Sequence, residues 1–296
     1  MPSSASISSL VFAPLASGSR GNCTYVGDGR FGLLIDCGIS TKQIFARLEE
    51  IGLGDAPIDA VFITHEHSDH VGAAGVLSRA LQRRNGVDVP FYMTGGTARS
   101  LSRGCIPDRI AELRPGREIA IGDLSVQAYA IPHDVAEPVA FAVTRGDVRV
   151  GVVTDLGHAT PLVRQLVGTL DAALLEFNHD LDMLRSGPYT WSLQERIRGA
   201  RGHLSNTQAA ELLTSSATPR LKHLVLAHLS EENNTPEIAA AVAHQALGLL
   251  GLSGVRVQVA QQDRALAPLF VQGRERPSLV VVRGGERAEE RQLAMF

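Results

Sequence analysis

Short apolar runs alternate with longer segments of helical periodicity along most of the chain. The apolar runs are bounded by turn residues and predict strands at residues 8–13, 23–26, 31–36, 58–64, 89–93, 118–130 (a hairpin turning at Gly122), 139–144, 148–154, 171–177, 221–227 and 255–259. Helical spacing predicts helices at residues 40–51, 71–84, 97–103, 161–167, 191–198, 205–215 and 236–249. Two β-rich halves, each flanked by helices, predict an α/β protein with a layered core.

The predicted elements belong to one domain, and the sequence changes character at its end. Residues 273–296 contain the polar stretch GGERAEER, in which five of the eight residues are charged. Such a composition cannot bury enough apolar surface to fold by itself. We therefore expect one catalytic domain over residues 1–272 and a flexible tail over residues 273–296.

The composition is that of an ordinary globular protein. Hydrophobic residues make up 44% of the 296 residues, charged residues make up 20%, and the net charge is -3. This charge gives no overall attraction to nucleic acid or membrane, so a site for a polyanion must be local. The cysteines Cys23, Cys37 and Cys105 lie far apart, which favours a reducing compartment. Because the start is not signal-like and no apolar run has membrane length, we expect a cytoplasmic protein without a membrane partner.

In the segment THEHSDH at residues 64–70, five of the seven side chains can bind or orient a metal ion. The segment follows a predicted buried strand and precedes a predicted helix. His65 and His67 are two positions apart, so they point the same way on an extended turn, while Asp69 and His70 reach in from the start of the helix. Imidazoles and carboxylates gathered in one turn indicate metal ligands.

Other polar residues also stand where buried strands end. His133 follows the run 124–131, Asp155 follows 148–154, and His228 follows 224–227. Asp36 ends the strand 31–36, where a carboxylate can brace the metal loop. A donor set of imidazole and carboxylate without thiolate suits zinc or manganese. Two such cations sharing one water would make it a nucleophile near neutral pH.

The pattern HxHxDH after a buried strand resembles the metallo-β-lactamase superfamily. The resemblance implies a four-layer αββα sandwich with one or two divalent metal ions at one edge of its sheets, and the ligands present here are enough for two. It assigns the ligands as His65, His67 and His133 on one cation, Asp69, His70 and His228 on the other, and Asp155 as the bridge. Metal ions of this kind can activate water for attack on phosphodiesters and equally on lactones or thioesters. The ligand set alone therefore does not identify the substrate.

A histidine outside the ligand set points to phosphate. His203 stands just before Ser205, which forms a capping-box pattern with Gln208, and the N-terminus of a helix favours an anion. The segment is similar to the helix-start histidine of ribonuclease Z. That similarity implies that His203 gives a proton to the leaving oxygen and that Glu176 is its acidic partner. The alternatives are that His203 is only a surface histidine and that Glu176 is only a structural hydrogen-bond acceptor.

Polar residues in neighbouring loops predict substrate contacts. These candidates are Ser17, Ser19, Asn22, Arg201, Ser205, Asn206, Ser230, Asn233 and Asn234. The loop at residues 17–22 suits an anion through its backbone N–H groups, or is only a tight hairpin turn. The arginines before His203 suit phosphate, or form a solvated helix face.

Several segments, among them LLIDCG, TDLGHAT, LLEFNHD and GHLSNTQAA, together resemble the YycJ-type branch of the superfamily over residues 8–259. The resemblance implies a DNA exonuclease that acts from the 5′ end, with links to DNA repair. The alternatives are a hydrolase of a small phosphodiester, lactone or thioester, and a non-catalytic DNA-binding module. The chain end, with Gln292, Leu293, Met295 and Phe296, is similar to peptides that dock repair proteins on the sliding clamp.

Overall fold

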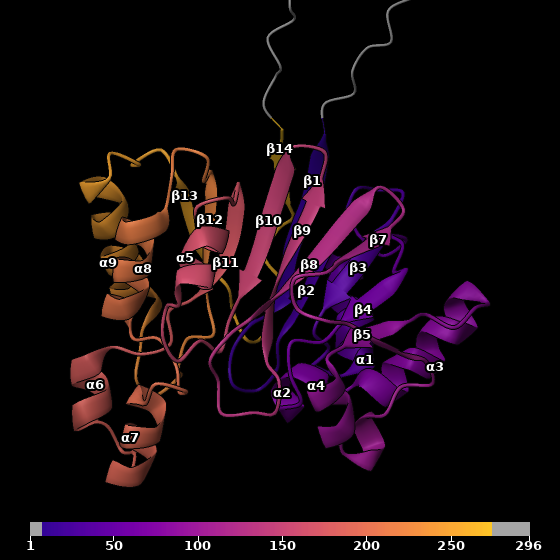
Figure 1. The fold of residues 1–296 in the computed structure, drawn as a ribbon, viewed down its shortest axis with the longest axis horizontal. Helices are drawn as coiled ribbons and strands as arrows, with labels where there is room; N and C mark the ends of the chain where they lie inside the picture. The colour runs from indigo at the N-terminus through magenta and orange to yellow at the C-terminus, as the bar shows by residue number, and fades with distance from the viewer. Residues whose placement is uncertain (1–7, 274–296) are drawn as a thin grey trace, which may run out of the picture.

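The computed structural model describes residues 8–273, which form two seven-stranded sheets packed face to face (Figure 1). The first sheet has the order β14 (Leu269–Gln272), β1 (Ser9–Ala16), β2 (Cys23–Gly27), β3 (Gly32–Ile35), β4 (Ala60–Phe62), β5 (Phe91–Met93) and β6 (Ile110–Glu112). The second has the order β13 (Arg256–Val259), β12 (His223–Ala227), β11 (Ala172–Glu176), β10 (Val148–Val153), β9 (Val139–Arg145), β8 (Leu124–Ala130) and β7 (Glu118–Ile121).

Each sheet has an antiparallel part and a parallel part. Strands β3 to β6 are parallel in the first sheet, and strands β10 to β13 are parallel in the second. Parallel strands need crossover connections, which are mostly helical here. Because parallel strands end at the same edge, residues that follow β3, β4, β10 and β12 can meet there.

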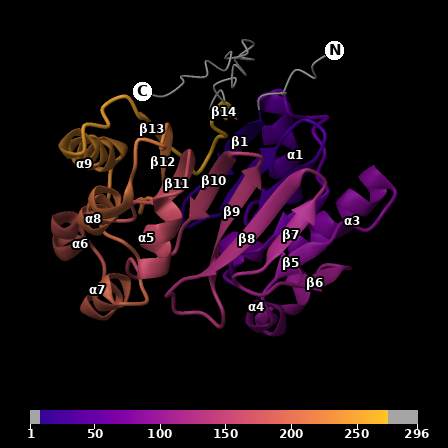
Figure 2. The same cartoon turned by 45° about the horizontal axis from the view of Figure 1, so that its top comes forward.

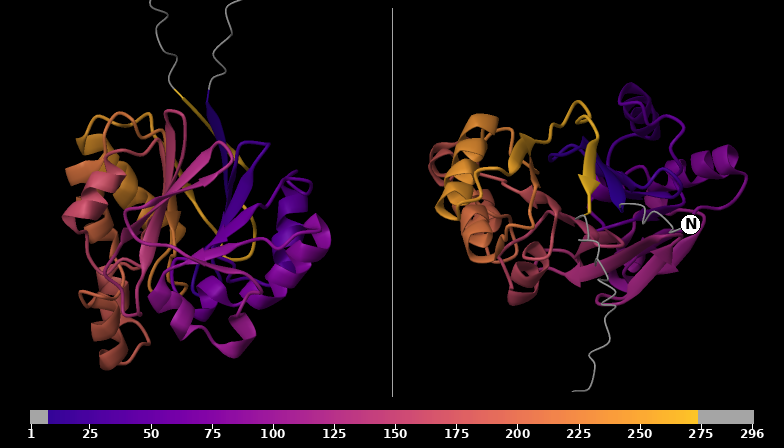
Figure 3. Two further views of the ribbon diagram at one scale, coloured as in Figure 1. Left: turned by 45° about the vertical axis from the view of Figure 1, so that its right-hand side comes forward. Right: turned by 90° about the horizontal axis from the view of Figure 1, so that it is seen from above.

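Helices cover the outer faces of both sheets (Figures 2 and 3). On the first sheet they are α1 (Thr41–Glu50), α2 (Ser68–Val71), α3 (Ala74–Asn85) and α4 (Gly95–Ser100), with a short 3₁₀ turn at Arg103–Cys105. On the second they are α5 (Pro161–Val167), α8 (Asn206–Ser216) and α9 (Pro236–Leu249). The helices α6 (Leu181–Ser186) and α7 (Trp191–Arg198) lie beyond α8, towards the end of the molecule that holds α2 and α4 (Figure 1).

Three apolar clusters hold the layers together. Between the sheets, Phe62 packs edge-on against Phe141 with ring centroids 5.5 Å apart. A second cluster joins the first sheet to its helices, including Leu48 of α1, and a third joins the second sheet to helices such as α8 through Leu212. The layers therefore run helix, sheet, sheet, helix. This arrangement confirms the predicted α/β fold with its four-layer αββα sandwich.

Local signals in the sequence gave many element boundaries. The capping boxes at Ser40 and Ser205 are both formed, and Gly122 turns the β7–β8 hairpin with a φ of 57°. The helices expected at 161–167, 191–198 and 236–249 are present with those bounds. No helix within residues 8–273 is long and apolar enough to cross a membrane.

Other elements differ from the prediction. The helix expected at 71–84 is two helices, because the chain turns at Gly72 and the Ala73 N–H donates to the Cys37 carbonyl instead of to its own helix, at 2.9 Å. The helix expected at 97–103 begins earlier, where Thr94 caps α4, and ends at Ser100. Strands β6 and β14 and helix α6 were not predicted, since each is too short to show a period.

Candidate active site

The ends of β3, β10 and β12 share an unusual backbone conformation. Asp36, Asp155 and His228 directly or closely follow these strands and have φ values of 61°, 57° and 54°. Within residues 8–273 they are the non-glycine residues with positive φ. This left-handed conformation costs energy for a residue with a side chain, and such strain gathers at functional sites. Here it turns three polar side chains towards one place.

One histidine group lies beside the end of β4. His65, His67 and His133 each offer a nitrogen, and these ligand atoms lie within 4.8 Å of one another. His65 Nε2 is 3.1 Å from His67 Nδ1. His133 Nδ1 is 3.1 Å from the Gly202 carbonyl, which accepts its hydrogen and leaves Nε2 with a free lone pair towards the group.

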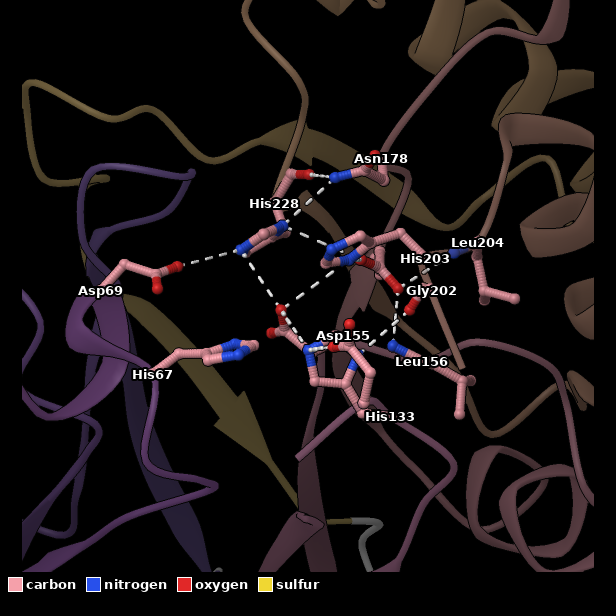
Figure 4. A network of polar contacts seen from close by, with 12 residues as sticks. His67, Asp69, His133, Asp155, Leu156, Asn178, Gly202, His203, Leu204 and His228 are labelled. Carbon is pink, nitrogen blue, oxygen red and sulfur yellow. Dashed lines mark hydrogen bonds and ion pairs between the residues drawn. The ribbon is translucent and has the colours of Figure 1, made fainter. Parts of the chain in front are cut away.

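A second group lies next to the first. Asp69, His70 and His228 also hold their ligand atoms within 4.8 Å of one another. Between the groups stands Asp155, with Oδ2 3.2 Å from His70 Nε2 and Oδ1 3.5 Å from His228 Nε2. Asp155 Oδ1 is also 3.9 Å from Nε2 of His133, so its carboxylate reaches towards both groups (Figure 4).

Unpartnered buried atoms test whether these residues suit a cation. His133 Nε2, His228 Nε2 and Asp155 Oδ2 are buried and make no hydrogen bond, although charged neighbours lie 3.2–3.5 Å from them. Buried polar atoms are normally satisfied, so exceptions that converge on one point call for an unseen partner. Nitrogen and carboxylate oxygen donors without thiolate fit zinc or manganese. The clustered residues therefore fit divalent metal binding.

Electrostatics favours a charged form of the cluster. Burial opposes the charge on Asp155, but the surrounding imidazoles hold the pKa of its carboxyl well below the usual value. Burial likewise opposes the charge on His70, but Asp155 and Asp36 raise the pKa of this imidazole well above its ordinary value. Cation binding must displace a proton from such a histidine, so metal affinity rises with pH.

Asp36 braces the metal loop from behind. Its Oδ2 lies 2.8 Å from His70 Nδ1, and its Oδ1 accepts a hydrogen bond from the Thr64 N–H at 2.8 Å. The Thr64 hydroxyl donates to the same carboxylate. These contacts fix the ring of His70 so that Nε2 faces the cluster. Sequence reasoning named Asp36 but missed Thr64, whose role depends on contacts that no motif shows.

His203 and Glu176 form a pair beside the cluster. His203 Nδ1 is 2.7 Å from Glu176 Oε1 and 3.8 Å from Asp155 Oδ1. Glu176 Oε2 accepts hydrogen bonds from the N–H groups of Leu156 and Leu204 at 2.8 and 3.2 Å. Burial lowers the pKa of His203, but Glu176 more than offsets it, and the pKa is raised. Although Glu176 lies close enough to be a ligand, its oxygens are engaged, so it orients His203 (Figure 4).

A cavity of about 230 Å³ opens at the cluster. It is lined by Ser19, His67, Asp134, Asn178, Tyr189, Leu193, Arg196, Ile197, Gly202, His203, His228 and Ser230. Of the predicted substrate contacts, Ser19 and Ser230 belong to this lining. Arg201 is exposed but does not line the cavity.

The other predicted contacts are buried and bonded within the protein. They are Ser17, Asn22, Ser205, Asn206, Asn233 and Asn234. Ser17 accepts from the His228 N–H at 2.8 Å, and Asn22 donates to the Gly18 carbonyl at 3.0 Å. Asn206 and Asn234 exchange amide hydrogen bonds at 3.0 and 2.9 Å. These residues shape the loops around the site, and Asn22 also reaches the ligand cluster, because its Nδ2 lies 3.0 Å from His70 Nε2.

Several cavity residues escaped the sequence reasoning. Asp134 Oδ1 is 3.5 Å from His133 Nε2, and its Oδ2 is 2.7 Å from Arg196 Nε. Asn178 donates to the His228 carbonyl at 2.8 Å. Asp134 directly follows His133, and Asn178 lies two residues after Glu176, so their neighbours in the sequence could have indicated that both lie at the site. Arg196 is one of the arginines before His203 that were predicted to suit phosphate at the entrance, and it does line the cavity.

The family of the chain follows from comparison with known proteins. A family model described as a beta-lactamase superfamily domain matches residues 32–228, a range that holds every candidate ligand. The chain belongs to this family. The metallo-β-lactamase fold protein YhfI from Bacillus subtilis has the same fold, with a TM-score of 0.66 over 90% of this chain and 100% of that one, at 16% identity.

Closer relatives within the beta-lactamase superfamily are named nucleases. The chain is 35% identical to the exodeoxyribonuclease YycJ of Bacillus anthracis, over 80% of this chain and 89% of that protein. It is 34% identical to the exodeoxyribonuclease WalJ of Streptococcus pneumoniae, over 77% and 84%. The resemblance to the YycJ-type branch is thereby confirmed. Family, relatives and ligand cluster together identify a metal-dependent hydrolase.

Proposed function

We propose that the protein is a DNA exonuclease that degrades strands from the 5′ end with a pair of divalent cations. The similarity to the exodeoxyribonucleases YycJ and WalJ supports DNA as the substrate, and the contact of 2.7 Å between His203 and Glu176 at the edge of the cluster supports phosphodiester cleavage. A thioester expels a thiolate, which needs no such acid, whereas a lactone and a phosphodiester both expel an alkoxide; the guanidinium of Arg196 in the cavity favours the phosphodiester. When water attacks a phosphodiester between nucleotides, the P–O bond to one nucleoside breaks and its oxygen departs as an alkoxide, a poor leaving group that a positioned imidazolium can protonate.

The chain offers one set of residues for each cation. His65, His67 and His133 would hold one, Asp69, His70 and His228 the other, and Asp155 would lie between them. When bound, zinc or manganese ions would supply Lewis acidity and a water of lowered pKa.

The protein's own residues then divide the work of positioning and proton transfer. The imidazole of His203 delivers a proton to the leaving oxygen, while Glu176 keeps that imidazole charged and aligned. Ser19, Ser230 and Arg196 line the cavity, where hydroxyls and a guanidinium can bind phosphate oxygens. We assign the buried residues Ser17, Asn22, Ser205, Asn206, Asn233 and Asn234 to shaping these loops, with Arg201 as an outer electrostatic contact.

End-labelled substrates test the activity directly. Metal-loaded protein and its Asp69→Asn variant are incubated with single- and double-stranded DNA labelled at either end, with RNA, with bis(4-nitrophenyl) phosphate and with a lactone. The proposal expects DNA to shorten from the 5′ end and the variant to be inactive. Asp182→Asn is a matched control, because this side chain is 90% exposed and belongs to none of the ligand groups. Lactone or small-phosphodiester turnover without cleavage of DNA would instead support the small-substrate alternative.

The predicted tail and clamp peptide lie outside the described residues 8–273. We carry forward as proposals a catalytic domain over residues 1–272, a cytoplasmic location and a role in DNA repair. Docking on the sliding clamp through Gln292, Leu293, Met295 and Phe296 would link the nuclease to replication. Deletion of residues 292–296 should abolish clamp binding in a titration and leave DNA cleavage unchanged. Equal clamp affinity of the full and shortened chains would remove this part of the proposal.

A further inference from the structure

Helix α7 is unusual because none of its residues is buried. An isolated helix of this length is unstable in water, and most helices in proteins are held by a packed apolar face. In α7 the apolar side chains remain open instead. Trp191 is 76% exposed and Leu193 is 37% exposed. The chain thus keeps its single tryptophan on the surface. One exposed apolar side chain is ordinary by itself, so its position relative to the cavity decides what it can bind.

Helix α7 lies against the active-site cavity. Tyr189, just before the helix, lines the same cavity as His203 and His67, and so do Leu193, Arg196 and Ile197 from the helix itself. Arg196 also ties α7 to the loop after His133, through its contact of 2.7 Å with Asp134. The helix therefore forms one wall of the active-site cavity. Trp191 does not line the cavity itself and stands at the N-terminal end of this wall, two residues after Tyr189.

The aromatic, apolar and charged side chains of this wall together favour one kind of ligand. A lipid or an apolar peptide would offer the guanidinium of Arg196 no partner besides Asp134, and would offer none to the hydroxyl of Ser19. A nucleotide satisfies both parts, since its phosphate pairs with the guanidinium and its base has a π-face that stacks on an aromatic ring. Resting on the proposed nuclease function, we infer that Trp191, together with Tyr189, is a stacking surface for an unpaired base of the DNA strand whose phosphate enters the cavity.

The single tryptophan provides a direct test by fluorescence. The metal-loaded Asp69→Asn protein, which binds without cutting, is titrated with a short 5′-phosphorylated oligothymidylate that carries a label for anisotropy. Stacking of a base should quench the tryptophan emission in step with the anisotropy. An abasic strand of equal length has the same phosphates and should bind without quenching.

Substitutions test the same surface in the active enzyme. Trp191→Ala should raise the KM for single-stranded DNA by roughly 5- to 100-fold, the usual effect of losing one stacked base, and leave kcat unchanged. Trp191→Phe should restore most of the affinity, and Trp191→Ala should hydrolyse bis(4-nitrophenyl) phosphate as the unaltered protein does. Phe270→Ala is the matched control, since Phe270 is an aromatic residue, 66% exposed, on β14 at the opposite end of the molecule (Figure 1).

The outcomes separate this inference from the function on which it rests. If DNA is cut with unchanged KM by Trp191→Ala and the tryptophan emission does not respond, the stacking surface is wrong and the nuclease stands. If anisotropy shows no binding of DNA or RNA at all, the proposed function fails and takes the inference with it. Equal quenching by an RNA strand supports the stacking surface, because every base offers a π-face.

Discussion

Asp36 Oδ2 and His70 Nδ1 lie 2.8 Å apart, behind the cluster that faces the cavity. The aspartate contributes no ligand atom to the metal-binding groups, yet it fixes the ring that does. It also holds the loop itself, since Thr64 N–H and Oγ1 donate to the same carboxylate. Stability of the loop and basicity of a metal ligand therefore depend on one buried side chain.

Replacing Asp36 should weaken metal binding without removing a ligand. Asp36→Asn keeps the size of the side chain, and asparagine tolerates the positive φ, so the backbone is not the cause of any effect. We expect zinc affinity to fall roughly 10- to 100-fold, as for other partners of metal-bound histidines. Competition with a chromophoric chelator measures this change. Asp182→Asn should leave the affinity unaltered, and an unaltered affinity for Asp36→Asn would show that the contact is not used.

Breaking the contact between Glu176 and His203 should slow the cleavage of substrates with poor leaving groups far more than that of substrates with good ones. His203→Gln should lower kcat on DNA by about 10²- to 10⁴-fold, because proton transfer to the leaving alkoxide is lost. The same variant should hydrolyse bis(4-nitrophenyl) phosphate nearly as well as the unaltered protein, since nitrophenolate leaves without a proton.

Glu176→Gln should lower kcat on DNA about as much as His203→Gln does. The double variant should have a kcat little lower than that of either single variant. Metal content, measured by elemental analysis, serves as the control. Equal losses on both substrates would indicate that the pair only supports the fold of the site.

Acid should destabilise the protein partly through His179. Burial lowers the pKa of this imidazole to about 4, although Glu176 acts in the opposite direction. In the unfolded chain the pKa is about 6.5, so the unfolded state binds more protons between these values. The stabilising contribution is therefore complete above pH 6.5 and is lost as the pH falls towards 4.

Between pH 7.5 and 5 the His179 contribution should fall by about 2 kcal/mol. Urea unfolding of metal-free protein at both pH values measures the total change, to which the ligand histidines also contribute. His179→Gln should show a smaller loss than the unaltered protein. Identical losses in the two proteins would place the pH sensitivity elsewhere.

The buried amides of Asn206 and Asn234 should stabilise the protein as a unit. Each donates to the other, and Asn234 also donates to the Phe177 carbonyl at 2.8 Å. Either alanine substitution leaves a buried amide unsatisfied, which costs about 1–3 kcal/mol. The double variant should cost less than the sum, giving a coupling of about 0.5–3 kcal/mol in chemical unfolding. Simple additivity of the two substitutions would contradict the pairing.

The candidate ligands were open to prediction because strand ends are local features. An apolar run that stops at His65, Asp155 or His228 places a polar side chain at the edge of a sheet, whatever the rest of the chain does. The types of these side chains then limit the chemistry to hard or borderline cations. The capping boxes at Ser40 and Ser205 were predictable for the same reason, since both partners lie within one helical turn.

The sequence alone thus determined the layered α/β fold and the residues able to bind cations, because periodicity and strand ends act over a few residues. Only the tertiary structure decided which polar side chains face the cavity. Asn22 and Asn206 turn inward to satisfy buried backbone and amide groups, whereas Arg196 and Tyr189 reach the cavity because α7 folds back over it. Those choices depend on contacts between segments far apart in the chain, for which no local pattern exists.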